Sequence, residues 1–241
     1  MIECIKLMRR QWEKLHSPGT NITASQAPAL LGYSPYESAL TAHARALGLL
    51  PPRDTSITMR CGHVLEPLVA RLYTEETGRK LTNPGKYTGF RNTERPWLAC
   101  TLDRLWPGNG PVELKTTGDF SAAKLWRRGS APDANIIQLL VQMYCTDTYM
   151  GSLAGLMHNR GFVTFDVPRD DAMLADLLAL LDRVHDNLLA GILPDEVDGS
   201  DSTAETLAVL HPLDNGLTQI VGTGEAEKIR EWADLKQGIA A

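Results

Sequence analysis

The sequence predicts a mixed α/β (α+β) fold in which helices and strands share one hydrophobic core. Apolar residues recur at helical spacing over 57–77 and 170–190, and a glycine that favours a helix C-terminus follows each stretch. Two antiparallel strands are predicted over 149–158 and 161–167, joined by a short link, and side chains alternate along the second. With 241 residues, of which 43% are hydrophobic, the chain is long enough to bury such a core.

Composition and charge argue against several classes of protein. The 24 Lys and Arg residues are outnumbered by 29 Asp and Glu residues, which argues against a protein that coats nucleic acid but not against an enzyme with a basic groove. The four cysteines form no Cys-x-x-Cys pair, so neither a zinc site nor an iron–sulfur site is indicated. No apolar run has the length of a membrane span, and the N-terminus lacks the pattern of a signal peptide. We therefore expect a cytoplasmic protein with no membrane partner.

The chain is predicted to divide near residue 200. The stretch 194–203 is acidic and contains Gly and Ser, as linkers do. We expect a main domain over 1–199 and, within 200–241, a linker followed by a small appendage. A strand over 217–221 and a helix over 225–236 would form that appendage.

The N-terminal part is predicted to contain three short helices. Apolar spacing favours one over 5–15. A capping-box pattern, in which Ser or Thr is followed three residues later by Glu or Gln, occurs at 23–26 and 34–37 and predicts a helix start at each. The first of these starts, with the hydroxyl of Ser25, could seat a phosphate, although ordinary capping explains the pattern more simply.

A strand over 111–116 carries the residues around which the site is predicted. Successive side chains of a strand point to opposite faces, so Glu113 and Lys115 share one face. A second strand candidate over 98–106 precedes it, and the Gly/Pro-rich turn between them predicts a hairpin that brings Asp103 beside Glu113. Two carboxylates beside a lysine suit a Mg²⁺-dependent phosphodiesterase. The alternative is a surface ion pair next to an ordinary turn.

Two helices supply further polar candidates. Glu66 lies on the first of the two long predicted helices, directly before Pro67, which removes a backbone hydrogen bond and favours a kink. A helix over 133–145 is apolar around most of its circumference but carries Gln138 and Gln142 one turn apart. A buried glutamine must be hydrogen-bonded, so each is either a core amide with a backbone partner or a site residue.

Six short motifs occur in a fixed order along the chain. They are WEKLH at 12–16, ITAS at 22–25 with LGYSPY at 31–36, GHVLEP at 62–67, LACTLD at 98–103, VELK at 112–115 and QLLVQM at 138–143. In this order and spacing they resemble the YqaJ-type viral recombinase family, the relatives of the bacteriophage lambda exonuclease. The resemblance covers roughly 10–195. It implies the core of the PD-(D/E)xK nuclease superfamily, a restriction-endonuclease-like fold with a central mixed β-sheet flanked by helices.

The resemblance implies a catalytic set and a metal site. The catalytic residues it implies are Glu66, Asp103, Glu113, Lys115 and Gln138. The expected cofactor is Mg²⁺, for which Mn²⁺ can substitute. Its expected ligands are the carboxylates of Asp103, Glu113 and Glu66 and the main-chain carbonyl of Leu114. Lys115 would orient or deprotonate the attacking water, with its neutral form favoured by nearby cations and partial burial.

The resemblance also implies a 5′-phosphate site formed by Ser25, Thr101 and His16. His16 stands where the lambda enzyme has an arginine, and an imidazole clamps phosphate more weakly than a bidentate guanidinium. The loop after His16 is also longer than in that enzyme. Leu102 replaces the proline usual before the metal-binding aspartate, which removes no ligand. We therefore expect a metal site of the family type and a less strict dependence on the 5′-phosphate.

The function implied is Mg²⁺-dependent hydrolysis of DNA in phage-type recombination. The resemblance implies a 5′-to-3′ double-strand exonuclease that leaves 3′ single strands. It also implies a trimer around DNA, with DNA ends and a single-strand annealing protein as partners. Two alternatives stay open: an endonuclease or nickase of the same superfamily, and a catalytically silent DNA-binding or assembly module. A silent module has no need of all five catalytic residues, which counts against it.

Overall fold

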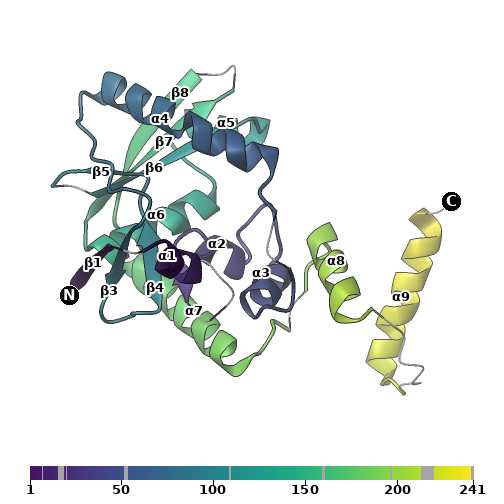
Figure 1. The fold of residues 1–241 in the computed structure, drawn as a ribbon. Coiled ribbons are helices and arrows are strands. Elements are labelled where there is room, and N and C mark those ends of the chain that lie inside the picture. Colours follow the sequence, from purple (N-terminus) through teal and green to yellow (C-terminus); the bar gives the residue numbers. More distant parts are fainter. Residues whose placement is uncertain are drawn as a thin grey trace. The chain divides into compact units, whose positions relative to one another are not determined.

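The computed structural model describes residues 1–6, 8–15, 19, 21–51, 54–108, 110–158, 161–195, 197–212 and 220–239. The chain divides into two compact units, Met1–Val209 and Leu210–Ala241. The large unit contains both β-sheets and the predicted site (Figure 1). In the small unit, α9 (Thr223–Ile239) forms where a helix is predicted over 225–236, whereas most of the strand predicted over 217–221 lies outside the described residues.

The strands form two four-stranded sheets. The first sheet has the order β1 (Ile2–Lys6), β3 (Thr88–Asn92), β4 (Leu98–Thr101) and β2 (Ile22–Thr23). The second sheet has the order β5 (Arg104–Trp106), β6 (Gly110–Thr117), β7 (Met150–Met157) and β8 (Gly161–Pro168). Only β2 with β4 and β6 with β7 pair in parallel, and the other neighbours are antiparallel. The mixed α+β class is confirmed, and the expected central sheet is divided where the chain passes from β4 to β5.

The long helices form where the apolar spacing predicts them. The helix α4 (Ile57–Thr77) begins after Ser56, whose hydroxyl accepts a hydrogen bond from the Met59 N–H, and ends at Gly78 in the left-handed conformation. The helix α7 (Asp171–Ala190) is capped in the same way by Asp170 and Gly191. The other helices of the large unit are α1 (Arg9–Leu15), α2 (Ala27–Leu30), α3 (Ala39–Ala46), α5 (Phe120–Arg127), α6 (Asp133–Thr146) and α8 (Asp201–Leu210).

The three N-terminal helices begin later than predicted, because strand pairing in one case and local hydrogen bonds in the other two compete with the helix. Residues 2–6 pair with β3 as an antiparallel strand, so α1 starts only at Arg9. The Gln26 Oε1 accepts from the Thr23 N–H at 3.0 Å and stabilises a turn ahead of α2. The Ser34 hydroxyl accepts from the Tyr36 N–H at 3.1 Å, which leaves Ser38 as the cap of α3.

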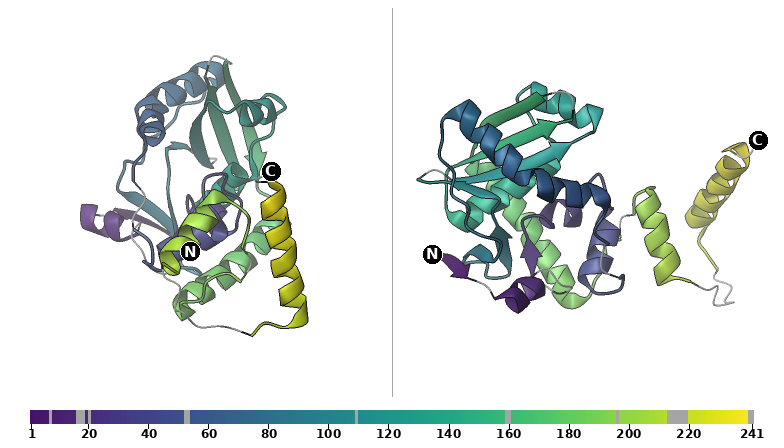
Figure 2. Two further views of the ribbon diagram at one scale, coloured as in Figure 1. Left: turned by 90° about the vertical axis from the view of Figure 1, so that its right-hand side faces the viewer. Right: turned by 45° about the horizontal axis from the view of Figure 1, so that its top comes forward.

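Helices cover both faces of the second sheet. On one face, Val69 and Tyr73 of α4 pack against Val112 and Leu114 of β6. The opposite face of β6, which carries Glu113, lies against α6. Figure 2 shows α4 and the strands of this sheet from two further directions. Since side chains alternate along β6, this arrangement separates an apolar face from a polar one on the same strand.

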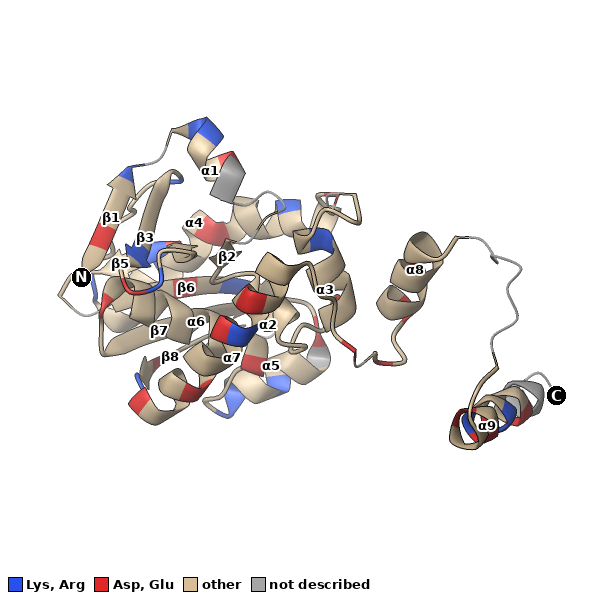
Figure 3. Cartoon of the chain, turned by 90° about the horizontal axis from the view of Figure 1, so that it is seen from below, with Lys and Arg blue, Asp and Glu red and all other residues tan. Residues whose placement is uncertain are grey.

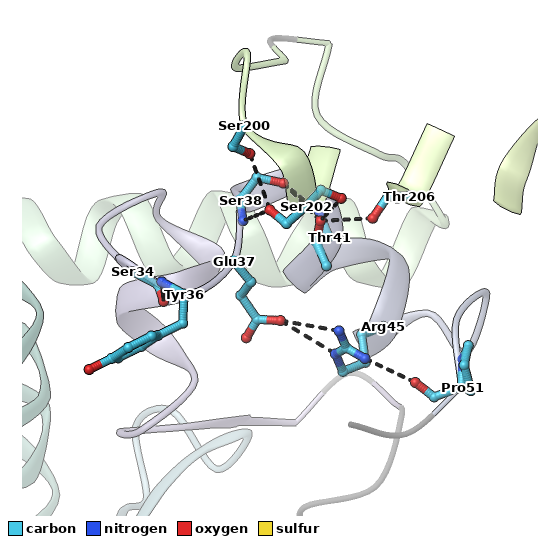
Figure 4. Close-up of polar contacts among 10 residues, drawn as sticks. All are labelled: Ser34, Tyr36, Glu37, Ser38, Thr41, Arg45, Pro51, Ser200, Ser202 and Thr206. Carbon is cyan, nitrogen blue, oxygen red and sulfur yellow. Dashed lines mark hydrogen bonds and ion pairs between the residues drawn. The ribbon is translucent and has the colours of Figure 1, made fainter. Parts of the chain in front are cut away.

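The helix α8 forms within the stretch that the sequence analysis assigned to the linker and the appendage. Its hydroxyl-bearing side chains pack against α3 (Figure 4): the Ser38 N–H donates to Ser202 Oγ at 2.9 Å, and Thr41 Oγ1 lies 2.8 Å from Thr206 Oγ1. Thr203 and Thr206 are buried. Because the buried side is made of Ser and Thr, α8 lacks the apolar spacing that would have predicted it. Among the described helices, none combines the length and the apolar character needed to cross a membrane.

Candidate active site

Asp103 lies at the point where the chain leaves the first sheet and enters the second. The predicted hairpin forms between β5 and β6, with Arg104 opposite Val112. The strand predicted over 98–106 is interrupted at Leu102 and Asp103, which belong to neither β4 nor β5. The Leu114 N–H donates to Asp103 Oδ2 at 2.9 Å, and this bond fixes the carboxylate beside the strand that carries Glu113.

Glu113 is a buried carboxylate, with 3% of its surface exposed, and three side chains donate hydrogen bonds to it. Its Oε1 accepts from Gln138 Nε2 at 2.7 Å and from Lys115 Nζ at 2.6 Å. Its Oε2 accepts from Gln142 Nε2 at 2.6 Å. The two glutamines come from successive turns of α6, so this helix fixes the orientation of the carboxylate.

Lys115 is a charged ammonium in this arrangement. Its Nζ donates to Gln138 Oε1 at 3.0 Å, in addition to its contact with Glu113. Burial lowers the pKa of the Lys115 ammonium, but the carboxylates of Glu113 and Asp103 outweigh this effect and raise the pKa above its ordinary value. The neutral form that the sequence analysis expected is therefore disfavoured while these carboxylates have no other cation beside them.

The site has more negative charge than its own lysine balances. Burial and the neighbouring Glu113 carboxylate raise the pKa of Asp103 to about 8, against the smaller opposing effects of Lys115 and the Leu114 N–H. Within the described residues no donor contacts Asp103 Oδ1. Two carboxylates and the Leu114 carbonyl are the hard oxygen donors that Mg²⁺ prefers, and Mg²⁺ commonly uses one or two carboxylates and keeps several waters. The residues present therefore fit a divalent cation.

Glu66 of α4 has a different partner. Its Oε1 lies 2.6 Å from Arg104 Nη1, and the same guanidinium nitrogen donates to the main-chain carbonyl of Asp103. In the part of the chain that the structure describes, no cluster of three or more His, Cys, Asp or Glu side chains could hold a metal ion. Glu66 is therefore near the site but does not join Asp103 and Glu113 in one cluster.

The predicted 5′-phosphate residues lie at one end of the first sheet. The strands β2 and β4 are parallel, with Thr23 opposite Ala99, so Ser25 and Thr101 both follow this pair in the same direction. Ser25 is exposed, and its hydroxyl lies 3.1 Å from that of Thr23. The main-chain carbonyl of Thr101 lies 3.5 Å from Gln142 Nε2. His16 lies outside the described residues.

Comparisons with known proteins identify the family. The model of the YqaJ-like viral recombinase domain matches residues 11–149. The chain belongs to this family. The matched stretch of this YqaJ-type chain contains Glu66, Asp103, Glu113, Lys115 and Gln138. A search of curated proteins finds no match.

Solved structures share the fold of the YqaJ-type chain. An alkaline exonuclease from Laribacter hongkongensis, LHK-Exo, is 18% identical with a TM-score of 0.60, over 76% of this chain and 93% of that one. Its complex with dAMP gives 20% identity and a TM-score of 0.59, over 71% and 89% of the two chains. A phage-related exonuclease from Haemophilus somnus 129PT is 13% identical with a TM-score of 0.54, over 71% and 96%. The chain therefore has the fold of phage-type exonucleases, the PD-(D/E)xK fold.

Two site residues of the YqaJ-type chain are absent from the predicted catalytic set. Gln142 had a sequence signal, because it lies one turn from Gln138 on a helix predicted to be buried, and the structure shows that both amides contact Glu113. Arg104 had no such signal. Its partner Glu66 lies 38 positions earlier, on a helix whose placement over β5 the local pattern does not predict.

Proposed function

We propose that this chain is a Mg²⁺-dependent deoxyribonuclease, and that it degrades one strand of duplex DNA from the 5′ end and leaves 3′ single strands. The observation that carries the proposal is the pair of carboxylates, Asp103 and Glu113, held beside Lys115 and short of positive charge. Membership of the YqaJ-like viral recombinase family supports it. So does the fold, which is shared with an alkaline exonuclease whose complex with dAMP, a mononucleotide, is known.

The side chains have separate tasks in this proposal. Asp103 and Glu113, with the Leu114 carbonyl, would hold the cation, and Mn²⁺ would substitute for Mg²⁺. When bound, such an ion supplies Lewis acidity toward a phosphoryl oxygen and lowers the pKa of water. The Lys115 ammonium, held by its contacts with Glu113 and Gln138, would orient the attacking water and balance charge that develops on the phosphate. Gln138 holds Lys115 and Glu113 together through its two amide atoms.

The 5′ end of the DNA would bind at Ser25 and Thr101, with His16 as a third contact. The exposed Ser25 hydroxyl lies at the end of β2 that points the same way as the β4 end leading to Asp103. In Figure 3, blue and red segments are interspersed over the large unit. This distribution is compatible with an enzyme that contacts DNA at a confined site. A homotrimer, a single-strand annealing protein as partner and action in the cytoplasm complete the proposal.

End-labelled linear duplex, with and without a 5′-phosphate, beside a closed circular duplex tests this function. We expect Mg²⁺-dependent release of nucleotides from the 5′ end of the linear DNA and no cut in the circle. The Asp103→Asn variant is expected to release none above background. Cleavage of the closed circle would show that the chain is an endonuclease and not an exonuclease. Full activity of the variant, or release without a divalent cation, would contradict the proposed chemistry.

A further inference from the structure

Arg104 is a buried cation between α4 and the chain segment that carries Asp103. Its side chain is 11% exposed, and its Nη1 lies 2.6 Å from Glu66 Oε1. The same nitrogen donates to the Asp103 main-chain carbonyl. Arg104 therefore binds a helix carboxylate and the backbone of the adjacent aspartate at once, and neither contact uses the Asp103 carboxylate.

The charge of Glu66 is thus balanced by the protein itself. A guanidinium keeps its charge at any physiological pH, and removing one partner of a buried ion pair leaves the other uncompensated at high cost. A metal ion that recruited Glu66 Oε1 would have to displace Arg104 from an arrangement with two acceptors. Asp103 and Glu113 face the opposite situation, since Lys115 is the one cationic side chain that forms an ion pair with either of them among the described residues.

We propose that Arg104 occupies the position beside Glu66 that a metal ion would otherwise take, and so keeps this carboxylate from binding metal. The site would then hold a single divalent ion, at Asp103 and Glu113. Glu66 then acts as a positioning residue: through Arg104 it fixes the backbone carbonyl of Asp103. This inference rests on the proposed function in one respect, namely that the site binds a divalent ion.

Titration of the full chain with Mn²⁺, followed by calorimetry and by electron paramagnetic resonance, tests the inference without any activity measurement. We expect one ion per chain in the wild type. Glu66→Gln, whose amide oxygen still accepts from Arg104, is expected to change the dissociation constant by less than about threefold. Arg104→Met frees the Glu66 carboxylate, and this variant is expected to bind Mn²⁺ about tenfold more tightly or to take up a second ion. The double variant Arg104→Met with Glu66→Gln is expected to lose this gain.

Matched variants separate the possible failures. Arg104→Lys keeps the positive charge and is expected to bind one ion as the wild type does. Two ions in the wild type, or a loss of more than about tenfold in affinity on Glu66→Gln, would overturn the inference and leave the proposed nuclease intact. No Mn²⁺ binding by the wild type, or binding that Asp103→Asn does not weaken, would overturn both. If Arg104→Met fails to fold by circular dichroism, the wild-type stoichiometry and Glu66→Gln still decide.

Discussion

The two faces of the second sheet differ in how far the protein itself balances the charge of a carboxylate. On the face covered by α4, four side chains close a ring of hydrogen bonds. Arg79 donates to Tyr73 Oη at 2.9 Å, and Tyr73 donates to Ser152 Oγ at 3.1 Å. Ser152 donates to Asp166 Oδ1 at 2.7 Å, and Arg79 closes the ring by donating to both Asp166 carboxylate oxygens at 2.7 Å. Arg79 holds the pKa of Asp166 below its usual range, so this carboxylate is balanced within the protein.

On the face covered by α6, the balance is incomplete. Asp103 has a raised pKa because burial and Glu113 together outweigh Lys115. Gln142 gives its amide nitrogen to Glu113, but its Oε1 is buried without a hydrogen-bond partner among the described residues. A buried polar atom left unpaired costs free energy. The Asp166 cluster is therefore balanced within the protein, whereas the Asp103 and Glu113 cluster keeps an unpaired amide oxygen and a carboxyl group with a raised pKa.

The largest expected effect separates the two carboxylates by function. Asp103→Asn or Glu113→Gln is expected to reduce nucleotide release by about three orders of magnitude, because the cation loses a ligand. Asp166→Asn removes a carboxylate from the same sheet and is expected to keep the activity within about threefold of wild type when the protein is folded. Initial rates on end-labelled duplex at saturating Mg²⁺ measure both. Equal losses in the three variants would show that the two faces do not differ as proposed.

Much of this comparison follows from local sequence patterns. The alternation along β6 places Glu113 and Lys115 on one face, and the turn after β5 brings Asp103 alongside. These are consequences of strand geometry and turn chemistry, which act over a few residues. The bounds of α4 follow in the same way from its apolar spacing and from Gly78.

The remaining contacts depend on how distant elements dock. Arg79 and Asp166 are 87 positions apart, and Arg104 and Glu66 are 38 apart. No periodicity specifies which residue of a helix lies over which residue of a strand. The helix α8 was missed for another reason: its buried positions are Thr203 and Thr206, so burial there does not depend on apolar side chains.

Breaking the complete ring is expected to cost stability and little activity. Arg79→Met leaves Asp166 and Tyr73 without their shared donor and removes the guanidinium that lies 3.8 Å from the Trp106 ring centroid. Because the Arg79 and Asp166 side chains are 27% and 34% exposed, solvent screens part of the loss, and we expect about 1–3 kcal/mol. Urea unfolding measures it. The solvent-exposed ion pair of Arg71 with Glu75 gives the control, since Arg71→Met is expected to leave the urea midpoint nearly unchanged.

Removing the Gln142 amide is expected to have the opposite effect to Arg79→Met: a loss of activity with a smaller loss of stability. Gln142→Met keeps the side-chain volume and deletes the bond to Glu113 Oε2, so the carboxylate loses one of its two α6 contacts. Loss of an outer-shell partner commonly costs about 10- to 100-fold, and we expect the lower end because Gln138 remains. The loss of stability is expected to be smaller than that of Arg79→Met, because the substitution takes a donor from the buried Glu113 Oε2 but also removes the unpaired Gln142 Oε1. Rates and urea midpoints together check this, and a stability loss equal to that of Arg79→Met would contradict it.

The smallest expected effect is the part of the pH dependence of stability that comes from Asp166. The folded protein holds the pKa of Asp166 below the value of 3.8 that is normal for an aspartate, chiefly through the hydrogen bonds from Arg79. The unfolded chain therefore binds more protons than the folded one between these two pKa values. The contribution of Asp166 is present in full above pH 3.8 and is lost as the pH falls through the folded pKa. The difference in unfolding free energy between wild type and Asp166→Asn, measured between about pH 3 and pH 7, should be constant at the upper end and shrink toward the lower end. A constant difference over the whole range would mean that the Arg79 contacts do not favour the charged form of Asp166 over the protonated form.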